Sequence, residues 1–142
     1  MPKKNRKIRR VVVGNNKDGL SQVIFDSDMP NVHRRPNSPG TFFNEIWTSN
    51  VIPATISLGE DTSPIKGDLR HSPPERGVHW RLVQSSGKQV VLSDADARNS
   101  HAKMNKEGVS QLKEGGRHWN MHRTPTVDYG FCLKGKRHLV LD

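Results

Sequence analysis

Residues 41–48 read TFFNEIWT, and this stretch predicts a β-strand. Aromatic and β-branched residues predominate in it, and both kinds favour the pleated, half-buried surface of a β-strand. Outward along the chain, residues 79–83 (HWRLV) have the same character, and residues 90–92 form a shorter candidate. The stretch therefore predicts a sheet to which other parts of the chain contribute.

The N-terminal part predicts a β-hairpin. Residues 11–13 are three valines, and residues 14–19 (GNNKDG) supply glycine and asparagine, which tolerate the positive φ angles of a hairpin turn. Residues 21–25 then predict the returning strand. Two longer segments, 26–40 and 50–75, are rich in proline and other turn residues and predict loops.

One helix is expected, over residues 93–112. Ser93 is suited to cap its N-terminus, with Asp96 three residues later in the position of a capping box. The apolar face is weak and Gly108 interrupts it. After this helix, residues 131–133 and 138–141 predict a closing hairpin with a turn between them. The pattern is all-β with one accessory helix, as in a sandwich or barrel.

Composition excludes several classes of protein. Hydrophobic residues make up 32% of the 142 residues and mean hydropathy is −0.77. The apolar runs are too short for a transmembrane helix or the core of a secretory signal, so we expect no membrane partner. The single cysteine, Cys132, excludes an internal disulfide framework and a cysteine-rich zinc site, and we expect it as a small core residue. These features predict a cytoplasmic protein.

The net charge of +9 raises the possibility of nucleic-acid binding. The charge is concentrated in residues 1–10, which we expect as a basic tail ahead of a single domain over residues 11–142. Such a tail makes nonspecific phosphate contacts or is a solvated terminus with no partner. Its six basic residues are Lys3, Lys4, Arg6, Lys7, Arg9 and Arg10.

The C-terminal segment contains glycine, histidine and acidic residues at the spacing of a known sequence motif. It reads Gly116, five residues, His122, one residue, Thr124, three residues, Asp128, six residues, Gly135. This spacing resembles the first motif of the cupin superfamily, G-x5-H-x-H-x3,4-E-x6-G. The order of the words VVVG, PNVHRRP, FFNEIW and HRTPTVDYG is similar to that of small cupin-domain proteins, some of which are described as oxidoreductases of fungal polyketide clusters.

The resemblance implies a small antiparallel β-barrel of cupin type that binds an organic substrate in its mouth. It also implies a divalent transition metal held by histidines and a carboxylate, with open positions for chemistry. His122 and Asp128 are the implied metal or acid–base residues. Thr124 stands where the motif has its second histidine, and a hydroxyl is a poor ligand, so tight metal binding is not expected. Thr124, Tyr129 and His118 are the implied pocket residues.

Each of these residues also has a simpler interpretation. His122 is equally explained as a hydrogen-bonded, barrel-lining histidine, and Asp128 as the cap of a turn at Tyr129. Tyr129 itself is explained as a half-buried strand residue. The other histidines have no ligand spacing and are predicted to be surface or structural: His33, His71, His79, His101 and His138.

The second cupin motif is absent, so the expected barrel is incomplete after its first motif. A truncated gene product, a mispredicted reading frame, or strand exchange in a homodimer would each explain this. The leading hypothesis is a small-molecule-tailoring cupin, an oxidoreductase of secondary metabolism. The alternatives are a noncatalytic ligand-binding or pseudoenzyme cupin and a basic nucleic-acid-binding protein.

Overall fold

The computed structural model describes residues 6–54, 61, 69–87, 90–106 and 108–142. Lys3, Lys4 and most of the loop expected over residues 50–75 lie outside these residues. The chain divides into two compact units. The first unit is Met1–Asp68 with Pro73–Gln89, and the second unit is Leu69–Ser72 with Val90–Asp142. Strands predominate over helix, as the all-β prediction required, and the described strands form no closed barrel.

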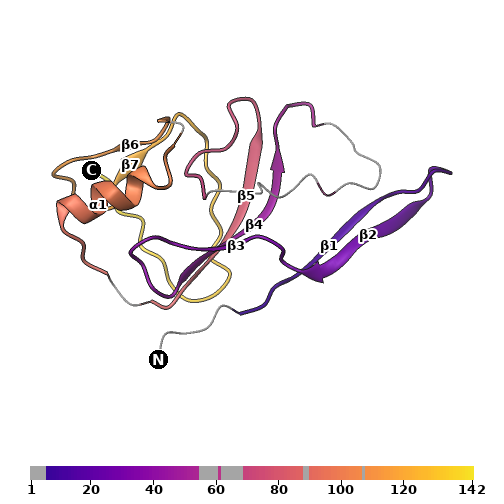
Figure 1. The fold of residues 1–142 in the computed structure, drawn as a ribbon, viewed down its shortest axis with the longest axis horizontal. Coiled ribbons are helices and arrows are strands. Elements are labelled where there is room, and N and C mark those ends of the chain that lie inside the picture. Colours follow the sequence, from indigo (N-terminus) through magenta and orange to yellow (C-terminus); the bar gives the residue numbers. More distant parts are fainter. Residues whose placement is uncertain (1–5, 55–60, 62–68, 88–89, 107) are drawn as a thin grey trace. The chain divides into compact units, whose positions relative to one another are not determined.

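The first unit begins with the predicted hairpin, β1 (Arg9–Asn15) paired antiparallel with β2 (Ser21–Asp28) (Figure 1). The turn is closed by Asn16, whose side-chain oxygen accepts hydrogen bonds from the backbone N–H groups of Asp18 and Leu20, both at 2.9 Å. Gly19 has a φ of 79°, a conformation that glycine adopts without strain. The turn residues therefore perform the role that the sequence assigned to them.

The first unit also contains an antiparallel sheet in the order β3-β4-β5, with β3 at Val32–Arg34, β4 at Thr41–Ser49 and β5 at Val78–Ser85. The TFFNEIWT stretch is thus its central strand, as expected. The loop predicted over residues 26–40 starts later, because β2 continues to Asp28, and it is interrupted by β3, because three of the five residues between Pro30 and Pro36 pair with β4. Where β5 begins, a Cβ on Gly77 would lie 2.0 Å from the carbonyl oxygen of Ser49, so glycine is required there.

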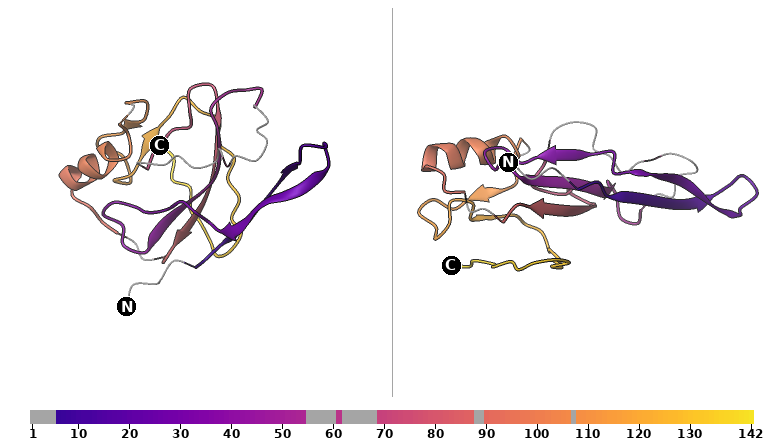
Figure 2. Two further views of the ribbon diagram at one scale, coloured as in Figure 1. Left: turned by 45° about the vertical axis from the view of Figure 1, so that its right-hand side comes forward. Right: turned by 90° about the horizontal axis from the view of Figure 1, so that it is seen from below.

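The second unit holds the helix α1 (Asp94–Ala102) and a two-stranded pair, β6 (Gln111–Leu112) with β7 (His122–Arg123) (Figure 2). Ser93 caps α1, accepting a hydrogen bond from the backbone N–H of Asp96 at 3.2 Å, as predicted. The predicted length was wrong, since the helix ends ten residues before Leu112.

The early end of α1 has a local cause in Asn105. Its side-chain amide donates to the carbonyl oxygen of Ser110 at 2.7 Å, and its side-chain oxygen accepts from the N–H of Ser110 at 2.8 Å. This closes a loop in which Gly108 has a φ of 70°. A side chain that hydrogen-bonds the backbone in this way competes with helix continuation.

The closing hairpin expected over residues 131–141 does not form. Gly135 makes a bend with a φ of 90°, but neither flank is a strand, and residues 90–92 are not a strand either. Cys132, expected in a core, is exposed, with its Sγ 3.5 Å from the carbonyl oxygen of Gly135. The C-terminal trace runs as irregular chain in both views of Figure 2.

Buried side chains in the described residues are mostly polar. The buried hydrophobic side chains are Met29, Phe43, Ala97 and Met104, whereas the buried polar and charged set includes Arg10, Thr41, Asn44, Glu45, Thr48 and His101. No described helix is long and apolar enough to cross a membrane. Burying a polar group is costly unless it is hydrogen-bonded. The buried polar side chains and their partners are therefore the first place to look for a functional site.

Candidate functional site

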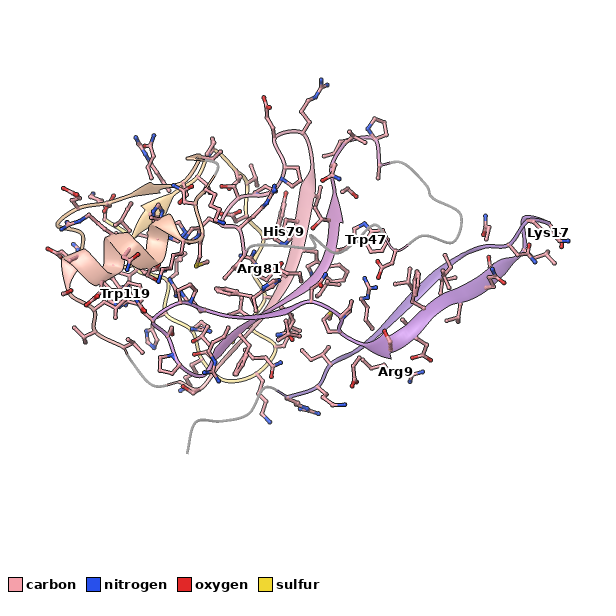
Figure 3. The ribbon with its side chains drawn as sticks, in the orientation of Figure 1. Arg9, Lys17, Trp47, His79, Arg81 and Trp119 are labelled. Atoms are coloured by element: carbon pink, nitrogen blue, oxygen red, sulfur yellow. The ribbon has the colours of Figure 1, made fainter. Side chains whose placement is uncertain are left out.

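The centre of the β4–β5 pair carries a group of polar side chains on one face, which we call the polar face: Glu45, Thr48, His79 and Arg81. Cross-strand pairing places Glu45 opposite Arg81 and Thr48 opposite His79. His79 and Arg81 are two residues apart on β5, so they point to the same side of the sheet (Figure 3). The polar face therefore follows from the register of the two strands.

Glu45 is held between two cationic or potentially cationic partners. Its side chain is 3% exposed and hydrogen-bonds Nε2 of His79, which is itself 6% exposed. Nε of Arg81 donates to both carboxylate oxygens of Glu45, at 2.9 and 3.1 Å. The Arg81 guanidinium also lies over the ring of Phe43, 4.8 Å from its centre. The carboxylate thus fixes the orientation of both neighbours.

The ionisation of Glu45 reflects this environment. Burial acts to raise the pKa of Glu45, but the hydrogen bond from His79 and the charges of Arg81 and His79 outweigh it and lower the pKa below its usual value. Glu45 is therefore a carboxylate at neutral pH. An imidazole bonded to a buried carboxylate is the arrangement that orients a histidine for proton transfer.

Thr48 differs from the other residues of the polar face in its hydrogen bonding. It is 3% exposed, and its Oγ1 has no hydrogen-bond partner among the described residues. On the opposite face of β4, Asn44 donates through Nδ2 to the carbonyl oxygen of Leu82 at 3.1 Å, while its Oδ1 has no partner within the described part of the chain. Buried polar atoms without partners are uncommon and indicate a place for a bound water or ligand.

The residues implied by the cupin resemblance lie in the second unit and are not brought together as a metal-binding pair. His122 donates through Nδ1 to the carbonyl oxygen of Asn120 at 2.7 Å, whereas Asp128 accepts from Thr126 at 3.1 Å. Both are exposed, and neither bonds the other. Thr124 hydrogen-bonds Thr126 at 2.6 Å, so Thr126 links Thr124 to Asp128 along one segment.

The two remaining predicted pocket residues lie apart from any described polar cluster. Tyr129 is 85% exposed, which contradicts the expectation of a half-buried strand residue. His118 accepts through Nδ1 from the backbone N–H of Asn120 at 3.1 Å, and its ring lies 5.2 Å from that of Trp119. Trp119 in turn donates to the carbonyl oxygen of Val90 at 2.6 Å. His118 therefore has a local structural role.

The second unit brings together three histidines that show no spacing in the sequence. The His71 ring lies 4.9 Å from that of His101 and 4.6 Å from that of His122, and the last two are 6.0 Å apart. Nε2 of His101 hydrogen-bonds the hydroxyl of Ser110 at 2.9 Å. Burial, followed by the charge of His122, lowers the pKa of His101. The three rings pack segments from different parts of the chain against one another.

The metal implied by the resemblance finds no ready ligand set. Among the residues that the structure describes, no group of three or more His, Cys, Asp and Glu side chains is arranged to hold a metal ion. His122 and Asp128 are directed to Asn120 and Thr126 rather than to each other. The donor set therefore does not fit a bound transition metal, and we derive no chemistry through one.

Three of the described basic residues near the N-terminus, Lys7, Arg9 and Arg10, are paired with carboxylates. Lys7 lies 2.6 Å from Asp28, and Arg9 lies 2.6 Å from Asp26, whose pKa is lowered by the hydrogen bond from Arg9. β1 begins at Arg9, inside the segment expected as a tail. Ion-paired side chains are less available to phosphates, so the described part of this segment gives little support to a nucleic-acid interface.

Glu45, His79 and Arg81 are not marked as site residues by the sequence pattern. The pattern predicts His79 as a surface or structural residue and Glu45 only as part of a strand. One signal was present: a charged residue in the middle of an aromatic strand, with His79 and Arg81 two apart in a second strand. Two-residue alternation places the latter pair on one face, but the sequence does not show which strands pair.

No protein-family model matches the chain, and neither a curated protein nor a solved structure matches it.

Proposed function

We propose that this chain binds a small, oxygen-rich organic molecule on the polar face and tailors it, as a cupin-type oxidoreductase of secondary metabolism such as polyketide biosynthesis. The observation that carries the proposal is the buried hydroxyl of Thr48, which lies across from His79 on the face of the Glu45 network and has no hydrogen-bond partner among the described residues. A ligand oxygen would give this hydroxyl its missing hydrogen bond.

The polar face offers distinct roles to its residues. Arg81 supplies a fixed positive charge for a ligand carboxylate or enolate oxygen. His79, oriented by Glu45, transfers a proton to or from the ligand. Thr48 anchors a neutral oxygen. We also propose that the strands form a cupin-type antiparallel barrel in a cytoplasmic protein, because such barrels turn the polar face of their strands toward a ligand.

Binding is tested with phenolic carboxylic acids, salicylate among them, and with 1,3-diketones, followed by NMR titration of the whole chain. We expect saturable binding that Thr48→Val weakens about tenfold, the value of one lost hydrogen bond. Ser49→Ala is the matched control, since Ser49 is the next residue of β4 and opposes Val78 on the other face. If no member of the set binds saturably, the proposal is wrong.

The alternative function is a noncatalytic ligand-binding or pseudoenzyme cupin. It is supported by the described part of the chain, in which no group of three or more His, Cys, Asp and Glu side chains is arranged to hold a metal ion. Mass spectrometry of the bound compounds separates the two. In air-saturated buffer, with dissolved oxygen as the oxidant that is reduced to hydrogen peroxide, a product that has lost two hydrogens, and that His79→Gln abolishes, supports the oxidoreductase. Binding without any product supports the alternative.

The roles implied for His122 and Asp128 stay predictions, and the same assay tests them. If the resemblance assigns them correctly, His122→Gln abolishes product formation. If the polar face carries the chemistry alone, His122→Gln leaves the rate unchanged. A second copy of the chain completing the barrel is part of the same prediction, and light scattering of the purified chain measures it.

A further inference from the structure

The polar face exists because β4 contains one extra residue. Side chains alternate along a strand, so Glu45 and Thr48, three positions apart, would ordinarily face opposite sides of the sheet. The register instead shifts between Glu45 and Trp47, and the two residues lie opposite Arg81 and His79, which share a face. A β-bulge at Ile46 therefore brings the Thr48 hydroxyl beside the Glu45 network.

A bulge removes a backbone group from the regular ladder, and that group then needs a partner. The carbonyl oxygen of Ile46 accepts a hydrogen bond from Nη1 of Arg10 at 3.1 Å. Arg10 belongs to β1, 36 positions earlier in the chain. The donor is thus supplied by a strand that does not pair with β4.

Arg10 is held in this position by burial and by a second contact. Its side chain is 5% exposed and pairs with the carboxylate of Asp61, with Nη1 3.2 Å from Oδ1 and Nη2 bonded to Oδ2. A buried guanidinium is stable only where a carboxylate and further acceptors are in place. Asp61 therefore fixes the guanidinium at the bulge.

We infer that Arg10 is a positioning residue for the polar face: together with Asp61 it holds the bulge at Ile46 that places Thr48 and Glu45 on one side of the sheet. The neighbouring Arg9 makes a comparable ion pair with Asp26. Both of these side chains are exposed, and neither hydrogen-bonds Ile46. Arg9 is therefore a natural control for the loss of an arginine and its ion pair.

The ring signals of His79 test the inference without any ligand. In the whole chain labelled with ¹⁵N-histidine, the hydrogen bond to Glu45 should give a characteristic Nε2 shift. We expect Arg10→Met to move this signal toward that of a solvated imidazole, because a relaxed bulge changes the register of Thr48 and Glu45 against β5. Arg10→Lys should move it less, since a lysine donates to Ile46 without the planar fork that engages Asp61. Arg9→Met should leave it unchanged.

A variant that fails to fold would not decide the question, so Asp61→Asn is measured in parallel. Loss of the carboxylate frees the guanidinium to move toward water, and we expect a smaller shift of the same His79 signal. If the folded variants Arg10→Met and Asp61→Asn both keep the wild-type His79 signal, the inference is wrong. A signal that moves equally in Arg9→Met overturns it as well, because the effect would then not depend on the bulge.

The functional consequence rests on the proposed function and is measured separately. If a probe such as salicylate binds the wild-type chain, Arg10→Met should weaken its binding about tenfold, as Thr48→Val does, while Arg9→Met leaves it unchanged. If no probe binds but the His79 signal moves in Arg10→Met, the positioning role stands and the proposed function fails. If a probe binds and neither readout responds to Arg10, the proposed function stands and the positioning role fails.

Discussion

β4 and residues 127–133 (VDYGFCL) resemble each other as sequences and differ as structures. Both are rich in large apolar residues, and both contain aromatic residues that favour strands. β4 is the central strand of a sheet with polar side chains buried, among them Asn44 at 0% and Glu45 at 2% exposure. Residues 127–133 form no strand, and their apolar side chains are exposed, with Phe131 at 85% and Leu133 at 81%.

The difference shows that strand propensity predicts a strand only where a partner strand is available. β4 pairs on both sides, with β3 and β5, and the ion pairs of Glu45 reduce the cost of its burial. The C-terminal segment has the propensity but no neighbour among the described strands. Strand propensity largely reports packing against cross-strand neighbours, so without them it has little effect.

The largest expected effect is the loss of the buried carboxylate. Glu45→Gln leaves the half-buried Arg81 guanidinium without its counter-charge and His79 without its carboxylate partner, and we expect unfolding in urea to become easier by about 3 kcal/mol. Glu75→Gln, an exposed change in the loop before β5, is the control and should leave the midpoint in place. Equal midpoints for the two variants would mean that β4 tolerates its polar burial without the network.

The second effect concerns the bulge. Arg10→Met leaves the Ile46 carbonyl without its donor and Asp61 without its guanidinium, and we expect a loss of about 2 kcal/mol in the same urea assay. Arg9→Met breaks only an exposed ion pair and should be indistinguishable from wild type. A similar loss in both variants would show that β1 contributes through charge alone.

Acid should affect the sheet through Glu45. Because the pKa of Glu45 in the folded chain is lowered, its contribution to stability is complete above the unfolded pKa of about 4.3 and is lost as the pH falls through the lower folded pKa. We expect the urea concentration at the midpoint of unfolding to decrease as the pH is lowered below about 4.5. For Glu45→Gln, this midpoint should depend less on pH over the same range. Parallel profiles for wild type and Glu45→Gln would assign the acid sensitivity to other groups.

The smallest effect is expected in the C-terminal segment. The double variant Phe131→Ser with Leu133→Ser removes two exposed apolar side chains and should change the free energy of unfolding by less than about 0.5 kcal/mol. If the chain self-associates, the same variant should lower its apparent mass in light scattering. A large loss of stability in the monomer would show that this segment packs against the protein in solution.

Much of the fold follows from local sequence. The hairpin of β1 and β2, the strands β4 and β5, and the cap of α1 at Ser93 depend on turn residues, β-branched runs and a capping serine that act over a few positions. The length of α1 does not follow in the same way. It is limited by Asn105, whose side chain competes for backbone partners that the helical pattern would have used.

The candidate site did not follow from the sequence. The C-terminal motif predicts His122 and Asp128, but spacing along one segment does not show where side chains point. The Glu45–His79–Arg81 network joins residues more than 30 positions apart, and hydrogen bonds at such separation leave no periodic trace. His71, His101 and His122 illustrate the same limit, because their rings meet only through the packing of the second unit.

Local sequence already specifies that the chain is rich in strands, where its first hairpin turns, and where its helix begins, because these features depend on contacts between near neighbours. Strand pairing, the extra residue at Ile46 that moves Thr48 to the face of Glu45, and the donor that Arg10 supplies to the displaced carbonyl all depend on the tertiary fold. They depend on it because the buried side chains among the described residues are largely polar. Apolar burial follows a simple pattern in the sequence, whereas a buried charge depends on a partner that any distant segment can provide.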